Sequence, residues 1–194
     1  MSAAHQILLA EPPFGDPYWA NVVLLIPGAG TLGGAPVDLS LLANSITNSG
    51  VVYDNAHAKF GSTSLKFTSP NFFTIASSTS LYAGTSQDFT IECWVNFNGA
   101  AANAWFVGQD NGSGSANGFN EIWVNDSGGN LITRLDCKDT SGANQVDATG
   151  GAQSFDASWH HVAFARHGRD LWGYYDGVFN NGGVNQFASR SHFA

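Results

Sequence analysis

Apolar and polar residues alternate most regularly between residues 89 and 97, in the segment FTIECWVNF. The apolar positions would share one face of an extended chain: Phe89, Ile91, Cys93, Val95 and Phe97. The positions between them would share the other face: Thr90, Glu92, Trp94 and Asn96. Because side chains alternate across a β-strand with a period of two, the segment predicts a strand with one buried face. Trp94 is expected to turn away from that face.

Other short apolar segments, separated by turn residues, predict further strands. The run 19–27 (WANVVLLIP) is apolar throughout, which predicts a strand buried on both faces. Segments 159–166 and 171–176 flank a His-Gly-Arg-Asp turn and predict a hairpin. The remaining predicted strands are 51–53, 59–69, 72–76, 105–109, 121–125, 130–137 and 146–148. Many short strands, with no long helical pattern, favour an antiparallel two-sheet β-sandwich or a barrel.

Composition agrees with a β-rich domain. Charged residues make up 11% of the chain and aromatic residues 13%, and there are 23 glycines. A helical bundle would need far more Glu, Lys, Leu and Ala on its surface. The chain has 15 acidic and 7 basic residues, a net charge of -8. No basic patch is visible, so nucleic acid is excluded as an expected partner.

The length of 194 residues fits one domain. We predict an extended, proline-rich arm over residues 1–17, a β-sandwich over 18–183 and a short tail over 184–194. No segment approaches 18 consecutive apolar residues, so membrane insertion is not expected. The N-terminus has no Lys or Arg before its short apolar run, so no signal peptide is predicted and synthesis in a cytoplasm is expected.

Four segments, in order along the chain, resemble one known family. They are VVLLIPGAG (22–30), KFGSTSLKF (59–67), DFTIECWVNF (88–97) and WHHVAFARHGRDLWGYYDG (159–177). The chain is similar in these segments to laminin-G-like domains, which are concanavalin A-like jelly rolls. The resemblance implies an antiparallel two-sheet β-sandwich that more often binds than catalyses, so we expect no enzymatic activity.

The opening segment DPYWANVVLLIPGAGT (16–31), followed by KFG and SLKF, resembles a subgroup encoded by bacteriophages as virion proteins. That resemblance implies a structural protein that decorates or cements a capsid, or belongs to a tail or fibre. The expected location is the virion. Expected partners are other virion proteins, further copies of the chain and host-surface glycans. A carbohydrate-binding, lectin-like module acting alone is the alternative.

Family members usually continue after the Asp-Gly turn at residues 176–177 with more strands. Only GVFNNGGVNQFASRSHFA follows Asp176 here. An apolar strand over 22–26 is therefore expected to lack its usual neighbour. Unpaired sheet edges tend to pair with another chain. We expect the arm over 1–17 or a neighbouring subunit to complete the sheet.

A glycosidase is the least favoured alternative. The segment EIWVND (121–126) resembles a decayed form of the E-x-D-x-x-E strand of laminarinase-like enzymes. Trp123 stands in place of the middle Asp, and Asp126 replaces the last Glu. A retaining mechanism needs two carboxylates about 5–5.5 Å apart. Glu121 and Asp126 have opposite strand parity and would point to opposite faces of a sheet.

Histidines and loop carboxylates are the candidate metal ligands of the chain. His160 and His161 are adjacent in a predicted strand, so they face opposite sides and cannot share a metal. Calcium, which prefers hard oxygen ligands, would have Asp110, Asp126 and Asp139 available. Asp is also a common turn residue, so no cofactor is predicted and calcium is left open.

Aromatic side chains offer the best candidates for ligand binding. Sugars stack on Trp and Tyr rings, and Asn and Asp side chains bind their hydroxyl groups. The candidates are Trp94, Trp105, Trp123 and Tyr174. A sandwich core also uses such residues, so core packing is the alternative for each. Cys93 and Cys137 are expected as buried thiols, and a disulfide between them is left open.

Overall fold

The structure is a computed structural model of the chain. It describes residues 17–76, 78, 80–81, 88–98, 104–108, 120–127, 130–138, 144–149, 153–154, 156–168 and 170–179. The predicted arm, except for its last residue, and the predicted tail lie outside these ranges, so their boundaries remain predictions. The chain divides into two compact units, Met1–Tyr82 and Ala83–Ala194.

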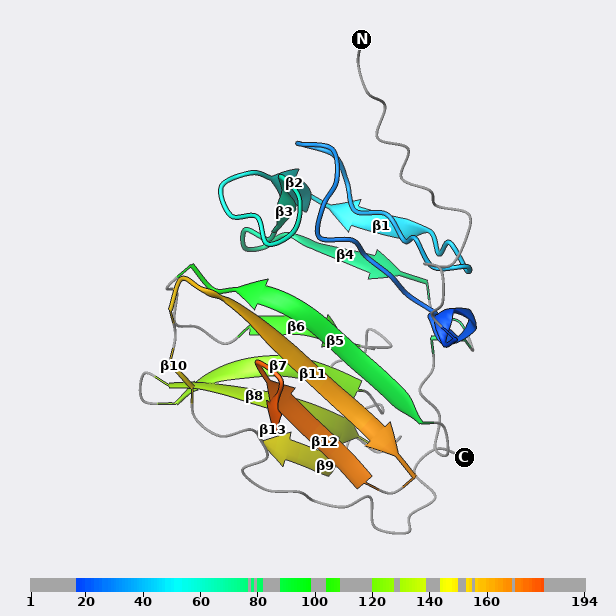
Figure 1. Ribbon diagram of the computed structural model, residues 1–194, viewed down its shortest axis with the longest axis vertical. Helices are drawn as coiled ribbons and strands as arrows, with labels where there is room; N and C mark the ends of the chain where they lie inside the picture. Colours follow the sequence, from blue (N-terminus) through cyan, green and yellow to red (C-terminus); the bar gives the residue numbers. More distant parts are fainter. Residues whose placement is uncertain are drawn as a thin grey trace. The chain divides into compact units, whose positions relative to one another are not determined.

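Within its described part, the first unit contains two antiparallel strand pairs (Figure 1). A short 3₁₀ helix, η1 (Trp19–Asn21), precedes them. β1 (Ile46–Ser49) pairs with β4 (Phe72–Ile75). β2 (Val52–Asp54) pairs with β3 (Ser64–Lys66). Three- and four-residue strands gain little from their own ladders, so this unit depends on side-chain packing and on polar contacts between its loops.

Val51 and Tyr53 are the most deeply buried apolar side chains described in this unit, at 0% and 3% exposure. The Tyr53 hydroxyl donates a hydrogen bond to the carbonyl of Pro27 at 3.1 Å. The Tyr53 ring lies directly against Gly30, where a Cβ would collide with it. The glycine-rich loop after residue 27 therefore packs against the ring of Tyr53 at Gly30.

The prediction of a buried strand over residues 19–27 is wrong. Residues 19–21 form η1, and residues 22–27 belong to none of the described strands. The side chains of Val23 and Leu25 are 38% and 36% exposed. The segment is not paired with a described strand, and the N–H of Leu25 is bound by a polar side chain that comes later in the sequence.

Asp38 is that side chain. Its buried carboxylate accepts hydrogen bonds from the backbone N–H groups of Leu25 at 2.9 Å, Ser40 at 2.9 Å and Asn44 at 2.8 Å. Burial acts to raise the pKa of this carboxyl, but the N–H donors outweigh it and the pKa lies below its ordinary value. A charged carboxylate thus binds a backbone group that a neighbouring strand would otherwise bind.

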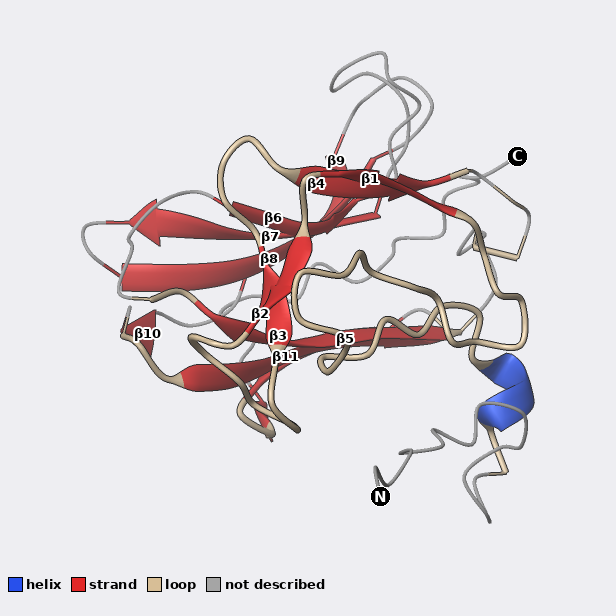
Figure 2. Cartoon of the chain, turned by 90° about the horizontal axis from the view of Figure 1, so that it is seen from above, coloured by secondary structure: helices blue, strands red, loops and turns tan. Residues whose placement is uncertain are grey.

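The second unit contains two antiparallel sheets. In one, the pairing order is β6 (Ala104–Gly108), β7 (Asn120–Ser127) and β8 (Asn130–Lys138), with both β9 (Asn144–Thr149) and β10 (Gln153–Ser154) paired to β8. In the other, the order is β5 (Phe89–Asn96), β11 (Trp159–His167), β12 (Asp170–Tyr175) and β13 (Val178–Phe179). Figure 2 shows β6–β8 and β5–β11 as separate layers. The predicted antiparallel two-sheet β-sandwich is confirmed.

The alternation predicted for β5 is confirmed by its burial, which changes at every residue from Phe89 to Trp94. Its apolar face continues onto β11, because Ile91 is the register partner of Phe164 and Cys93 that of Val162. Val162 and Phe164 are 0% and 1% exposed and form the centre of the described core. The sandwich therefore buries the face that the sequence pattern selected. No helix in the described part is long and apolar enough to span a bilayer.

Cys93 is a free thiol on the buried face of β5, so the disulfide left open by the sequence is not formed. Cys137 lies in β8, which belongs to the other sheet of the unit. Burial, with a smaller contribution from the charge of Glu92, raises the pKa of the Cys93 thiol to about 11. The thiol is protonated at neutral pH, and a protonated thiol is a poor nucleophile.

Candidate functional site

The candidate site lies at the turn between β12 and β13. Asp176 and Gly177 form a two-residue hairpin loop, since Tyr175 and Val178 on either side are register partners. Both loop residues have positive φ, +50° and +74°. Asp-Gly is the sequence that such a turn favours, because Gly carries no Cβ and Asp tolerates the left-handed region. Asp176-Gly177, the last two residues of the segment 159–177, therefore fixes this hairpin.

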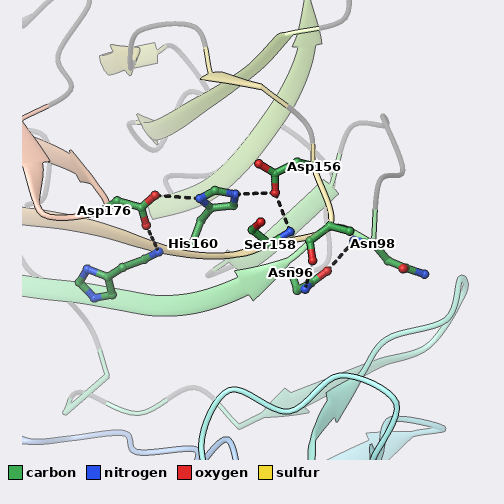
Figure 3. Close-up of polar contacts among 8 residues, drawn as sticks. Asn96, Asn98, Asp156, Ser158, His160 and Asp176 are labelled. Atoms are coloured by element: carbon green, nitrogen blue, oxygen red, sulfur yellow. Dashed lines mark hydrogen bonds and ion pairs between the residues drawn. The ribbon is translucent and has the colours of Figure 1, made fainter.

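Asp176 also bonds across the sheet to the start of β11. Its backbone N–H donates to the carbonyl of His161 at 2.9 Å. Its carboxylate accepts one hydrogen bond from the N–H of His161 at 2.8 Å and another from Nδ1 of His160 at 2.8 Å. One carboxylate thus binds both the backbone and a side chain of the neighbouring strand (Figure 3).

His160 is held between two carboxylates. Its second ring nitrogen, Nε2, lies 3.0 Å from Oδ1 of Asp156. The same oxygen accepts the N–H of Ser158 at 2.6 Å, which fixes the loop that leads into β11. The three side chains lie in one row in Figure 3. We call Asp156, His160 and Asp176 the clamp.

The clamp favours a charged imidazolium. Partial burial acts to lower the pKa of His160, but hydrogen bonds to Asp176 and Asp156, together with their charges, raise it above its ordinary value. The pKa of Asp176 is lowered, because its bonds to His160 and to the His161 N–H outweigh its burial. The N–H of Ser158 and the ring of His160 lower the pKa of Asp156. Both ring nitrogens point at acceptors, so the protonated His160 has no lone pair for a metal or for proton abstraction.

A pocket of about 340 Å³ opens beside the clamp. Its lining combines the clamp with apolar and amide side chains: Gln153, Asp156, His160, Tyr175, Asp176, Val178 and Phe179. Tyr175 stacks on the ring of His160, with the centroids 4.8 Å apart and the planes at 27°. Val178 and Phe179 are 68% and 54% exposed. The pocket thus has a rigid charged wall and an accessible apolar edge.

Tyr174, one of the predicted ligand-binding residues, is connected to this pocket. Its ring meets that of Phe179 edge to face, with centroids 6.0 Å apart and planes at 70°. The two residues are register partners in β12 and β13. Tyr174 therefore positions an aromatic side chain that lines the pocket.

Trp94 lies on the opposite face of the sheet from the buried core, as predicted, and is 41% exposed. Its ring contacts that of His161, its register partner, at a centroid distance of 5.1 Å. Nε2 of His161 lies 3.3 Å from a carboxylate oxygen of Glu92. The adjacent residues His160 and His161 therefore have different partners, which agrees with the prediction that they face opposite sides of the strand. No group of three potential metal-binding side chains is found in the part of the chain that the structure describes.

The other predicted residues are placed only by their backbone or not at all. Trp105 and Trp123 are register partners in β6 and β7. Asp126 is paired with Leu131 in β8. Asp110 and Asp139 lie outside the described residues. A calcium site at Asp110, Asp126 and Asp139 remains a prediction.

Glu121 and Asp126 retain opposite strand parity. The register between β7 and β8 runs from Glu121, opposite Asp136, to Asp126, opposite Leu131, without a shift. A bulge between the two acids would have been needed to bring them to one face. The backbone therefore supports the interpretation of this segment as an ordinary strand.

Sequence reasoning missed Asp156, Asp176, Gln153 and Phe179 as site residues. Asp176 had a detectable signal, since Asp-Gly after an aromatic strand marks a tight hairpin. Gln153 and Asp156 carried no such signal: Gln153 lies in β10, which pairs with β8 of the other sheet, and Asp156 lies in the loop before β11, where it contacts His160.

One family model matches the chain, over residues 67–192, and its description is the Concanavalin A-like lectin/glucanases superfamily. The match includes the clamp and every strand from β4 to β13. No curated protein and no solved structure matches the chain.

We predict that Asp176→Asn lowers the free energy of unfolding by about 1 kcal/mol near pH 5.5, because the amide lacks the charge and one acceptor oxygen. The pKa of Asp176 is lowered, so its contribution exists above the ordinary carboxyl pKa of 3.8 and is lost as the pH falls below it. The pKa of His160 is raised, so its contribution is complete below 6.5 and is lost as the pH rises through the higher folded value.

Urea unfolding from pH 3 to 9 should therefore show the largest difference between wild type and variant at about pH 4 to 6.5, with smaller differences on both sides. Asp88→Asn is the comparison: Asp88 is an exposed carboxylate outside the clamp that accepts the N–H of Gly168 at 2.6 Å and lies 3.8 Å from Nδ1 of His167, so it shows the effect of losing one carboxylate with a weaker histidine contact. A difference that does not change with pH would contradict the clamp.

Proposed function

Because the chain belongs to the Concanavalin A-like lectin/glucanases superfamily, we propose that it is a non-catalytic binding protein that holds a glycan in the pocket beside the clamp. The observation that carries this proposal is the lining of the pocket. It places an exposed Phe179 ring within the same cavity as the Asp156 carboxylate and the Gln153 amide.

The chemistry of a sugar suits this lining. A pyranose ring has an apolar face that stacks on an aromatic ring, and hydroxyl groups that donate to carboxylates and amides. Phe179 offers the stacking surface, and Val178 extends it. The carboxylate of Asp156 can accept more than the two hydrogen bonds described for its Oδ1. A volume of about 340 Å³ is at the low end for ligand sites, which favours a terminal sugar over a long chain.

The electrostatics of the pocket support binding over hydrolysis. A glycosidase needs one carboxylic acid with a raised pKa to protonate the leaving group. The two pocket carboxyls, Asp156 and Asp176, both have lowered pKa values, because each accepts hydrogen bonds that favour its charged form. Both are ionised at neutral pH and cannot act as that acid.

A rigid pocket also suits a binding module. His160 has a partner at each ring nitrogen, so its ring has no freedom to turn. A wall that is ordered before the ligand arrives lowers the entropic cost of binding. Trp94, whose ring contacts that of His161, lies on the opposite face of the sheet and is not part of this pocket.

A second candidate function is that of a virion structural protein, in which glycan binding serves attachment to a host surface. It is supported by the resemblance of residues 16–31 and 59–67 to a subgroup of bacteriophage virion proteins. It is also supported by apolar side chains exposed in the first unit, which assembly with other virion proteins would bury. These are Leu32, Val37, Leu41, Leu42, Phe67 and Phe72.

For the glycan site, we expect hits on a glycan array, and at least a tenfold loss of affinity in Phe179→Ala and in Asp156→Ala. The first change removes the stacking ring, and the second removes an acceptor of hydroxyl hydrogen bonds. Phe67→Ala is the matched control, because Phe67 is 56% exposed but belongs to the other unit. Titration by calorimetry measures each affinity.

Trp94→Ala distinguishes binding in the pocket from binding on the outer face of the sheet. It should reduce glycan affinity less than Phe179→Ala, because Trp94 does not line the pocket. An array without hits, or affinity unchanged in both pocket variants, would contradict the glycan site.

For the virion role, we expect mass spectrometry of purified particles to find the chain at a fixed copy number relative to the capsid protein. Its absence from particles that are otherwise complete would refute this role and would leave the glycan proposal standing.

A further inference from the structure

The first unit contains an extended segment with one backbone edge bonded and the other bare. On the bonded edge, the carbonyl of Val23 accepts hydrogen bonds from Ser40 Oγ at 3.3 Å and from Asn44 Nδ2 at 2.9 Å. The N–H of Leu25 donates to Asp38 at 2.9 Å, and its carbonyl accepts the N–H of Leu39 at 2.8 Å. Odd-numbered residues supply all of these groups, as in a strand paired along one side.

The groups of the even-numbered residues point to the other edge. Within the described structure, no hydrogen bond is made by the carbonyl of Val22, by either backbone group of Leu24 or by the N–H of Ile26. The N–H of Val22 is already used, since it donates to the carbonyl of Trp19 at 3.0 Å. We call the backbone of Val22, Leu24 and Ile26 on this side the bare edge.

The bare edge lacks three features that often prevent strand addition. Such edges are normally blocked by charged side chains, by Pro or by a bulge. Residues 22–26 are Val, Val, Leu, Leu and Ile, and Pro comes only at position 27. Exposure alternates from Val22 to Leu25, as in a strand, with Val23 and Leu25 the more exposed. An added strand would meet free N–H and C=O groups flanked by apolar side chains.

We propose that a second copy of this chain occupies the bare edge with its own residues 22–26, in an antiparallel arrangement about a two-fold axis at Leu24. The N–H of each Leu24 then donates to the carbonyl of the other Leu24. The N–H of each Ile26 donates to the carbonyl of the other Val22. This pairing uses the groups left bare and needs none that is already bonded.

Charge favours a second copy as the occupant. No charged residue occurs from Pro17 to Val37, although the chain as a whole carries a net charge of -8. A charged partner strand would find no complementary charge there, whereas a second copy brings an uncharged, apolar edge of identical pattern. A two-fold axis makes the contact isologous and self-limiting.

The ladder is short, because η1 precedes the segment and Pro27 ends it. It buries much less than the ~1,600 Å² of a standard interface. We therefore expect a weak dimer whose fraction rises with protein concentration. The proposal does not depend on the glycan pocket, which belongs to the other unit.

Sedimentation velocity of the full chain over a wide concentration range, with amide hydrogen exchange of residues 22–26, tests this dimer. The association constant should fall at least tenfold in Leu25→Lys, which places a charge on an exposed side chain at the edge. Leu24→Pro, which removes an N–H that has no partner in the described structure, should have the same effect. Leu32→Lys, at a site 59% exposed and outside the segment, should associate like wild type.

The Leu24 amide should exchange slowly at high concentration and fast at low concentration. A chain that is monomeric throughout would overturn the proposal, as would association unchanged in both edge variants. Slow exchange of Leu24 at every concentration would also overturn it, because it would mean that another segment of the same chain covers the edge.

Discussion

The geometry of the site depends on the carboxylate of Asp176. It accepts hydrogen bonds from the backbone N–H of His161 and from the ring N–H of His160, at the start of β11. The backbone N–H of Asp176 donates to the carbonyl of His161 in the same strand. Three hydrogen bonds at one residue fix the Asp-Gly turn against β11. This contact holds His160 over Tyr175 and places Val178 and Phe179 at the rim of the pocket. Without it, β13 would be a two-residue strand held only by its own ladder.

Because adjacent side chains of a strand point to opposite faces, His160 and His161 make contacts on different faces of one sheet. His160 turns to the clamp and to Tyr175, where its charge is balanced by two carboxylates. His161 turns to Trp94 and Glu92 on the outer face. One dipeptide therefore connects a polar pocket and an aromatic surface. This arrangement explains why the histidine pair needs no metal to account for its place in the hairpin.

The sequence predicted the parts of the fold that local pattern controls. Alternation located the buried and exposed faces of β5, and the polar turn located the β11–β12 hairpin. It failed for residues 22–27, because hydrophobic pattern does not show which groups bind the backbone, and here the side chain of Asp38 binds the N–H of Leu25. It also failed for the pocket, whose lining comes from β10, from β11 and the loop before it, and from the β12–β13 hairpin. Such a site depends on strand pairing, and periodicity does not encode which strands pair. Trp94 and Tyr174 lie in β5 and β12, as the local pattern predicted, and their role in ligand binding stays a prediction.

The protonation state of His160 is the most direct test of the clamp, because two carboxylates hydrogen-bonded to one imidazole ring favour its protonated form. Long-range ¹H–¹⁵N spectra of chain labelled at histidine, recorded across pH, would resolve its two ring nitrogens. The account predicts a titration midpoint above the ordinary 6.5, with both nitrogens protonated below it, and a lower midpoint in Asp176→Asn. A midpoint at or below 6.5 in the wild-type chain, unchanged by that substitution, would contradict it.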